Sequence, residues 1–424
     1  MSALALACAP HAAKAQNGAE AAGSAPSPAP ATAAVKDPIE AAAFDAAMAQ
    51  ADPAAQGAAL EAFVARYPNS LIRADALEKA TAAYLEARDL DKVEALSGRL
   101  LTLEPRNARA LAMLAFVLRQ RAAAAPADQA PALADKAAAV AERGLANLAG
   151  WRPAADAGGD AAASARSEMS AIFNGALGYR ALLQKDYATA RPYYLAAVAA
   201  DPTGLDDVYQ LAVVSLQGRP SDPVGFWWAA RAEALAAAAE DAHAKAAIEA
   251  YARPLYRRYH GTDDDWEGVL AQAQGAMAPP AGFAIAPAPS PASVAVQAVH
   301  DSPVASLSFS DWEFILAQRD ASPQNRAAAD KVWDNIAALQ SRGLKMRFKV
   351  KVIAVRPHAL DAAVTDNNQG AGHADLHVSL AVDPTSALKP GATTEVTGVL
   401  TGYTPSPFAF TMQQAQVEGD GGAN

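Results

Sequence analysis

AIFNGALGYRALLQKDYATARPYYLAAVAADP, residues 171–202, predicts two short helices that pack against each other. Gly178 on the first helix and Ala190 on the second are small enough to let the two backbones approach closely. The larger residues expected to fill the seam beside them are Leu177, Tyr194 and Leu195. A hairpin of this size cannot bury its apolar face alone, so neighbouring hairpins are expected to stack on it.

A sequence motif runs through the same stretch. Leu177-Gly178, Ala190-x3-Tyr194 and Pro202 match the pattern Trp-x2-Leu-Gly-x2-Tyr, then Ala-x3-Phe, then Pro, and Ala197 is a further small residue. The stretch therefore resembles a tetratricopeptide repeat (TPR), and these six residues would pack that repeat. The resemblance covers roughly residues 37–217. It implies an α-solenoid of helical hairpins whose concave surface binds a peptide or protein partner.

Further hairpins support this organisation. Two more helical pairs end at Pro68 and at Pro105, which are 37 residues apart, close to the family's repeat of about 34. Two insertions, residues 122–131 and 151–163, are expected to form loops at one edge of the stack. The sequence thus predicts a TPR-like helical repeat domain over residues 37–275.

Composition limits the class of protein. The chain has 424 residues with 35 Lys and Arg against 45 Asp and Glu, which gives a formal net charge of -10. This acidic balance argues against a general nucleic-acid binder. Hydrophobic residues make up 52% of the chain, and many are alanine, which favours helix but contributes little buried area. The N-terminal two thirds should therefore be closely packed helix.

The N-terminus carries a pattern typical of export. Residues 1–15, MSALALACAPHAAKA, contain an apolar run followed by an Ala-Lys-Ala site of the kind that signal peptidase cuts. We interpret them as a signal peptide of a periplasmic or secreted protein; the alternatives are an Ala-rich tail on a cytoplasmic protein and a lipoprotein acylated on Cys8. Residues 16–36 are expected to be a disordered linker. Cys8 is the only cysteine, which excludes a disulfide within the chain.

Two segments near the end of the helical region invite a functional interpretation. The repeat pattern decays at Gly218-Arg219-Pro220, as expected where a stack ends. Phe226-Trp227-Trp228 opens a helix on which three adjacent aromatics are not expected to face inward together, so Trp228 should cover a groove edge; the alternative is a ligand-binding aromatic patch. Residues 260–266, HGTDDDW, could hold a metal, but a helix boundary capped by Thr262 or Asp263 explains them.

The C-terminal third changes character. Residues 276–306 are rich in Pro and Ala and are expected to be a flexible linker, because their prolines disfavour helix and central strand. Residues 307–418 predict a small α+β domain with two leading helices and five strands in a β-barrel-like sheet. Its outline resembles the oligonucleotide/oligosaccharide-binding (OB) barrels. Residues 419–424 are a tail. The fold class is therefore mainly α, with a small β domain after a linker.

Two groups of residues in this domain could bind a ligand. Lys345, Arg347, Lys349 and Lys351 alternate along the first strand and could hold nucleic acid or another anionic polymer; the alternative is a solvated sheet face. His373, Asp375 and His377 also alternate, which would place three metal ligands on one strand face. Plain alternation with the apolar residues between them explains this second group as well.

Motifs of common enzyme classes are missing from the sequence. It contains no Gly-x4-Gly-Lys, no His-Glu-x2-His and no Gly-x-Ser-x-Gly. We therefore predict a noncatalytic scaffold for protein–protein interaction without catalytic residues, cofactor or metal. The alternative function is anion binding by the basic strand. A metalloenzyme that uses His373 and His377 is a third hypothesis.

Overall fold

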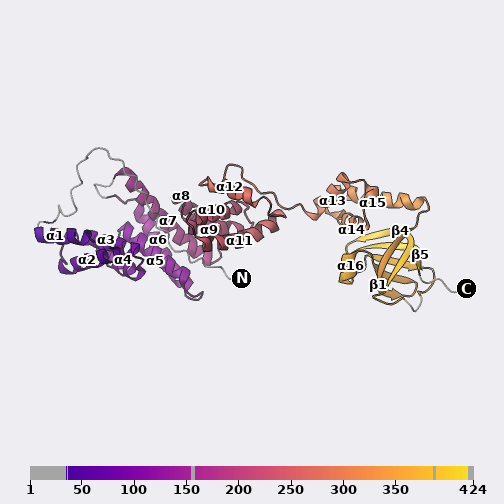
Figure 1. Ribbon diagram of the computed structural model, residues 1–424, viewed down its shortest axis with the longest axis horizontal. Coiled ribbons are helices and arrows are strands. Elements are labelled where there is room, and N and C mark those ends of the chain that lie inside the picture. Colours follow the sequence, from indigo (N-terminus) through magenta and orange to yellow (C-terminus); the bar gives the residue numbers. More distant parts are fainter. Residues whose placement is uncertain (1–34, 36, 154–157, 385–387, 419–424) are drawn as a thin grey trace. The chain divides into compact units, whose positions relative to one another are not determined.

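The computed structural model describes residues 35, 37–153, 158–384 and 388–418. The chain divides into two compact units, Met1–Pro287 and Ala288–Asn424 (Figure 1). The expected mainly helical chain with a small β domain is confirmed, because unit 1 is helical and unit 2 contains a closed five-stranded barrel. The predicted signal peptide and tail lie outside the described residues, as does the linker 16–36 except for Val35.

Unit 1 is built from helices that follow one another with short connections. Their bounds are α1 (Pro38–Met48), α2 (Pro53–Arg66), α3 (Arg73–Glu86), α4 (Leu90–Leu103), α5 (Ala108–Ala124), α6 (Ala130–Leu148), α7 (Gly159–Leu183), α8 (Tyr187–Ala200), α9 (Leu205–Gln217), α10 (Val224–Ala238), α11 (Ala242–His260) and α12 (Trp266–Gln274). Both expected insertions are shorter than predicted, because α5, α6 and α7 extend into them.

Aspartate starts many of these helices by capping their free N–H groups. Asp37 accepts a hydrogen bond from Ile39 N at 2.9 Å, and Asp52 accepts one from Ala55 N at 2.7 Å. In both cases proline follows at the first helical position, where a missing N–H costs nothing. The local sequence therefore fixes where α1 and α2 begin.

Aromatic rings lie directly over glycines where helices meet. A Cβ on Gly57 of α2 would lie 2.8 Å from the Tyr84 ring of α3, and one on Gly144 of α6 would lie 2.2 Å from the Phe173 ring of α7. Within one hairpin, a Cβ on Gly178 would lie 3.0 Å from a ring carbon of Tyr194. The glycines therefore set how closely adjacent helices approach.

Ion pairs connect helices that are not neighbours in sequence. Glu61 of α2 bonds Lys92 of α4 at 2.8 Å. Glu78 of α3 bonds Arg109 of α5 at 2.8 Å. The first pair joins two even-numbered helices, and the second joins two odd-numbered helices. Helix α5 also contacts α3 and α7 directly. Odd-numbered helices in this part of unit 1 thus share one surface.

The residues expected to pack the hairpin of α7 and α8 are placed as follows. Leu177, Gly178, Ala190, Tyr194 and Ala197 are buried, and Pro202 follows the end of α8. Leu195 was expected in the seam as well, but that prediction was wrong, because Leu195 is 40% exposed. It follows Tyr194 directly and so points about 100° away around the helix.

The end of unit 1 differs from the prediction. Phe226, Trp227 and Trp228 are all buried, so the expectation that they could not face inward together was wrong. The reason is that α10 packs against α9, α11 and α12 and is covered on every side. Helical packing therefore continues beyond Gly218.

The segment expected to be a flexible linker is partly structured. Ile285 is buried in the core of unit 1. Helix α13 (Pro291–Asp301) follows, with Ser290 accepting a hydrogen bond from Ser293 N at 3.1 Å. Pro291 was read as forbidding a helix, but at the first helical position it favours one. Ala295 of α13 is buried in the core of unit 2.

Unit 2 joins helices to a barrel. After α13 come η2 (Val304–Ser306), α14 (Phe309–Ala317), η3 (Arg319–Ala321), α15 (Pro323–Ser341), β1 (Met346–Arg356), β2 (Ala359–Ala363), α16 (Asp366–Ala371), β3 (Leu376–Leu380), β4 (Thr393–Pro405) and β5 (Phe408–Glu418). Helix α14 begins with a capping box of Ser308 and Asp311. Helix α16 was not predicted.

The barrel closes in the strand order β1-β2-β3-β5-β4. Strand β1 pairs antiparallel with both β2 and β4, whereas β3 pairs parallel with β5. Gly398 lies at an irregularity of the sheet, since the register of β4 against β5 shifts between Thr397 and Val399. Phe309 of α14 packs its ring 5.0 Å from Phe410, so the helices complete the core at the barrel wall.

Replacing Gly144 by alanine tests the ring-over-glycine contact. The added methyl group would overlap the Phe173 ring, so Gly144→Ala should lower the free energy of unfolding by about 1–3 kcal/mol in urea denaturation. Gly98 of α4 is the matched control, because nothing lies within 4 Å of its Cβ position. Gly98→Ala should raise stability by up to about 1 kcal/mol. Equal effects of the two substitutions would contradict the packing described.

Candidate functional site

A polar cluster crosses the middle of the helical stack. Arg119 of α5 and Asp207 of α9 form an ion pair at 2.6 Å, and each side chain is only 13% exposed. Gly175 of α7 lies between them; a Cβ there would be 2.2 Å from Nη1 of Arg119 and 2.7 Å from Oδ1 of Asp207. Glycine at this position therefore leaves the space that lets the pair form across α7.

Two tyrosines border this pair. The guanidinium carbon of Arg119 lies 6.0 Å from the ring centre of Tyr179. Tyr194 is fully buried, and its hydroxyl makes no hydrogen bond within the described part of the chain. Burial raises the pKa of Tyr194 well above its usual value, and the charge of Asp207 adds to this against the opposing charge of Arg119. Tyr194 is therefore a neutral donor at physiological pH.

Arg119 keeps its charge in this setting. Burial disfavours the cation, but the carboxylate of Asp207 outweighs it and raises the pKa of Arg119 above the usual range. The cluster thus combines a fixed guanidinium, the half-buried ring of Tyr179 and a carboxylate, groups of the kind that bind peptide carbonyls and charged side chains. Sequence motifs did not reveal it. The available signals were Gly175 in an apolar stretch of α7 and the charged residues Arg119 and Asp207 in helices that are mostly apolar.

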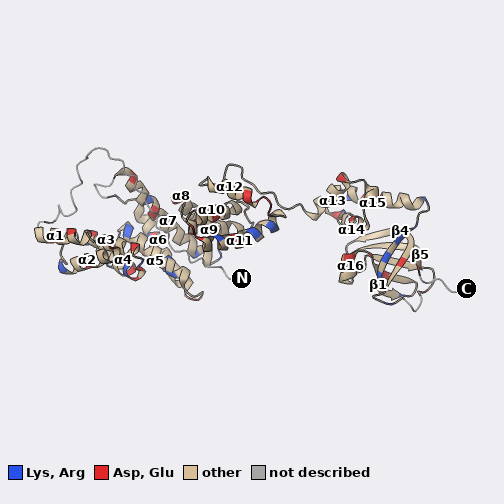
Figure 2. Ribbon diagram, viewed as in Figure 1, with Lys and Arg blue, Asp and Glu red and all other residues tan. Residues whose placement is uncertain are grey.

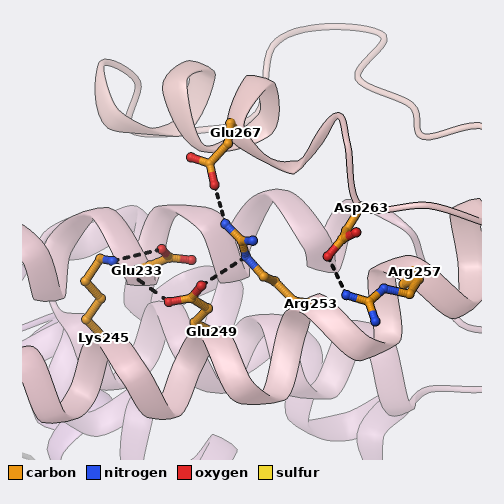
Figure 3. A network of polar contacts seen from close by, with 7 residues as sticks. All are labelled: Glu233, Lys245, Glu249, Arg253, Arg257, Asp263 and Glu267. Atoms are coloured by element: carbon orange, nitrogen blue, oxygen red, sulfur yellow. Dashed lines mark hydrogen bonds and ion pairs between the residues drawn. The ribbon is translucent and has the colours of Figure 1, made fainter.

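A second network ties the last three helices of unit 1 together (Figure 3). Glu233 of α10 is 1% exposed, and its Oε1 lies 3.6 Å from Nζ of Lys245 on α11. Lys245 also approaches Glu249, which Arg253 contacts at 3.1 Å. Arg253 in turn pairs with Glu267 of α12. Burial, together with the nearby Glu249, raises the pKa of Glu233.

The acidic segment after α11 serves as a connection between helices. Gly261 ends α11 with a φ of 99°, a conformation that favours glycine. Asp263 pairs with Arg257 at 2.6 Å (Figure 3). The expected cap at Thr262 or Asp263 was wrong, because α12 begins only at Trp266. Among the described residues, no group of three or more His, Cys, Asp or Glu could hold a metal ion.

The basic strand of unit 2 is balanced by acids. Lys345 lies just before β1, and Arg347 bonds Glu395 at 2.7 Å and Glu418 at 2.6 Å. Lys349 stands opposite Glu395 in the register of β1 and β4. Lys351 donates from Nζ to Gln369 O at 2.9 Å. Figure 2 accordingly shows basic and acidic segments beside each other on the barrel.

The three residues considered as possible metal ligands, His373, Asp375 and His377, do not share one face. Asp375 is buried and accepts hydrogen bonds from Val364 N at 2.7 Å, Thr365 N at 3.0 Å and Asn368 Nδ2 at 2.9 Å. His377 is exposed and bonds Asp361 through Nδ1 at 2.7 Å, whereas His373 precedes β3. The prediction of one shared face was wrong, because Asp375 turns inward to hold the loop before β3 instead of alternating along it.

Comparisons with known proteins do not assign this chain to a family. No protein-family model matches the sequence, and no curated protein shows significant similarity to it. Among the helices that the structure describes, none is long and apolar enough to cross a membrane.

Breaking the central pair tests its buried state. Arg119→Met leaves Asp207 charged without its partner, so we expect the free energy of unfolding, measured in urea, to fall by about 3–5 kcal/mol. The double variant Arg119→Met/Asp207→Leu should recover most of this loss, because no unpaired charge remains. Arg180→Met, which breaks a more exposed pair with Glu142, is the control and should cost less than about 1 kcal/mol. A double variant no more stable than Arg119→Met would contradict the account.

Glu233 gives a prediction about pH. Its pKa is raised in the folded protein, so ionised Glu233 lowers stability and the cost grows as the pH rises through its titration. Glu233→Gln should therefore be more stabilising, relative to the native chain, at pH 7 than at pH 4 in thermal denaturation. Glu267→Gln, at an exposed member of the same network, should show little such difference. A Glu233→Gln effect that is the same at both pH values would contradict the assignment.

Proposed function

We propose that this protein is a noncatalytic scaffold that binds a peptide or protein partner on the surface shared by α3, α5, α7 and α9. The observation that carries this proposal is the cluster of Arg119, Tyr179 and Asp207, which come from three odd-numbered helices and meet at one place on that surface. The TPR-like motif of residues 171–202 supports it, since stacked repeats of that kind form a concave surface that binds a partner.

The chemistry of the cluster indicates the kind of partner. Alanine-rich helices offer few specific contacts, so a fixed guanidinium beside a tyrosine ring stands out as a point of recognition. Arginine and tyrosine are enriched among residues that dominate binding energy at protein interfaces. A partner segment with free carbonyls for the Tyr179 hydroxyl would fit, because Asp207 already balances the charge of Arg119. Together with the signal-like residues 1–15, this leads us to propose a scaffold of the cell envelope.

The barrel of unit 2 is the weaker candidate for the binding role. Its strand order and the parallel pairing of β3 with β5 support the proposal that it is an OB-like barrel. Binding of an anionic polymer through β1 is disfavoured, because Arg347 is paired with Glu395 and Glu418, and Lys349 stands opposite the same Glu395 in the register of β1 and β4. Such a polymer would have to displace these acids.

Photo-cross-linking in the host cell tests the proposal. A benzophenone amino acid replaces Tyr179 on the odd-numbered surface in one variant, and Tyr193 of α8 in the control; both tyrosines are half-buried. Position 179 should yield one or a few discrete cross-linked proteins, and position 193 should yield them far more weakly. Equal yields of the same products at both positions, or none at position 179, would refute binding at this surface.

A further inference from the structure

A groove of about 630 Å³ lies along the last two helices of unit 1. Residues Pro280–Ala286, here called the strap, form one wall, and Tyr256 and His260 of α11 belong to the other. Ile285 of the strap is 8% exposed in the core of unit 1, and the half-buried Phe283 packs against the same core. These two side chains anchor the strap, so the groove has two defined walls. Its volume suits a small organic molecule.

The groove carries acidic side chains. Asp264 and Asp265, which directly precede α12, line it, whereas no Lys or Arg is among the described residues around it. Asp264 makes no ion pair in the described part of the chain. Arg257 of α11 is engaged outside the groove by Asp263 at 2.6 Å. The charge of the groove therefore favours a cationic ligand.

His260 and Asp265 present two acceptor atoms side by side. Nδ1 of His260 lies 2.8 Å from Ala286 O, a carbonyl that can only accept, so Nδ1 carries a proton and donates. In the neutral ring Nε2 is then an acceptor, and it lies 3.3 Å from Oδ2 of Asp265, which is an acceptor as well. An N–H group of a ligand placed between these atoms would satisfy both.

The hydroxyl of Tyr256 is a further polar group at the groove. Tyr256 is only 2% exposed, and its hydroxyl makes no hydrogen bond within the described residues. Burial, and then the charge of Asp265, raises the pKa of Tyr256, so the hydroxyl keeps its proton at neutral pH. Buried hydroxyls normally have a hydrogen-bond partner. A ligand in the groove would supply one.

We propose that this groove binds the guanidinium group of an arginine-like ligand, which donates hydrogen bonds to Nε2 of His260 and to Oδ2 of Asp265. A guanidinium is planar and carries its N–H donors in a fixed fork, so one group can reach both acceptors. The aliphatic stem would lie along the apolar strap, where the Phe283 ring offers a cation–π contact. The site belongs to α11, α12 and the strap, and is thus distinct from the proposed partner surface of α3, α5, α7 and α9.

An NMR titration of the full chain with ¹³C-labelled isoleucine methyl groups tests the site at pH 8, where histidine is ordinarily neutral. Ile285 lines the groove and reports its occupancy, and Ile336, buried in unit 2, is the internal control. N-acetyl-arginine amide should shift the Ile285 signal saturably and bind about tenfold tighter than N-acetyl-citrulline amide, which has nearly the same shape without the charge. Equal binding of the two compounds, or no shift at Ile285, would overturn the proposal.

Two further probes distinguish the source of the guanidinium group. Propylguanidine represents a free small molecule, and an Ala-Arg-Ala tripeptide with blocked ends represents a side chain of a polypeptide. Tighter binding of propylguanidine would assign the groove to a free guanidinium compound, and tighter binding of the tripeptide would assign it to an arginine of a protein partner. Binding of neither probe would contradict a guanidinium site.

Three variants make the test specific to the groove. Asp265→Asn should weaken binding of N-acetyl-arginine amide about tenfold, whereas Asp135→Asn, at an exposed acid of α6 outside the groove, should not change it. Gly268 lines the groove, and nothing lies within 4 Å of its Cβ position. Gly268→Trp should therefore fill the groove and abolish binding in a folded protein. Unchanged affinity in Asp265→Asn and Gly268→Trp would refute binding at this place.

Discussion

The close approach of an aromatic ring to a glycine is the constraint on which the helical stack depends. Tyr84 over Gly57 and Phe173 over Gly144 join the second helix of one hairpin to the first helix of the next. Each contact leaves no room for a side chain, so it fixes both the distance and the rotation of the two helices. Alanine-rich helices bury little area per residue, and the few large rings therefore determine how the hairpins align.

The alignment of the helices determines where charged side chains are buried inside unit 1. The Arg119–Asp207 pair forms only because Gly175 leaves space across α7, and a buried pair of this kind contributes more to specificity of arrangement than to stability. Glu233 of α10 is likewise buried, and Lys245 of α11 partly offsets its charge. Both sites place polar groups at junctions of three helices. The same polar junctions are where a binding partner or a change in pH could act.

Local patterns in the sequence predicted the parts of the fold that local chemistry determines. The hairpin of residues 171–202 and the alternating strand from Met346 onward follow from periodicity and from helix-stopping prolines. Burial of Phe226, Trp227 and Trp228 depends on three helices that surround α10, and no pattern within that helix shows its neighbours. Pro291 was misread because proline disfavours helix in the interior but favours it at the start. The cluster at Arg119 needed residues 88 positions apart to meet.

Hydrogen–deuterium exchange of the chain, alone and bound to the protein captured through position 179, would test the central claim most directly. The account predicts slower exchange in peptides from α5, α7 and α9 on binding, with little change in the even-numbered α6 and α8. It also predicts an unchanged barrel in unit 2. Protection confined to the barrel strands, or spread equally over odd- and even-numbered helices, would contradict a scaffold that binds through the surface around Arg119.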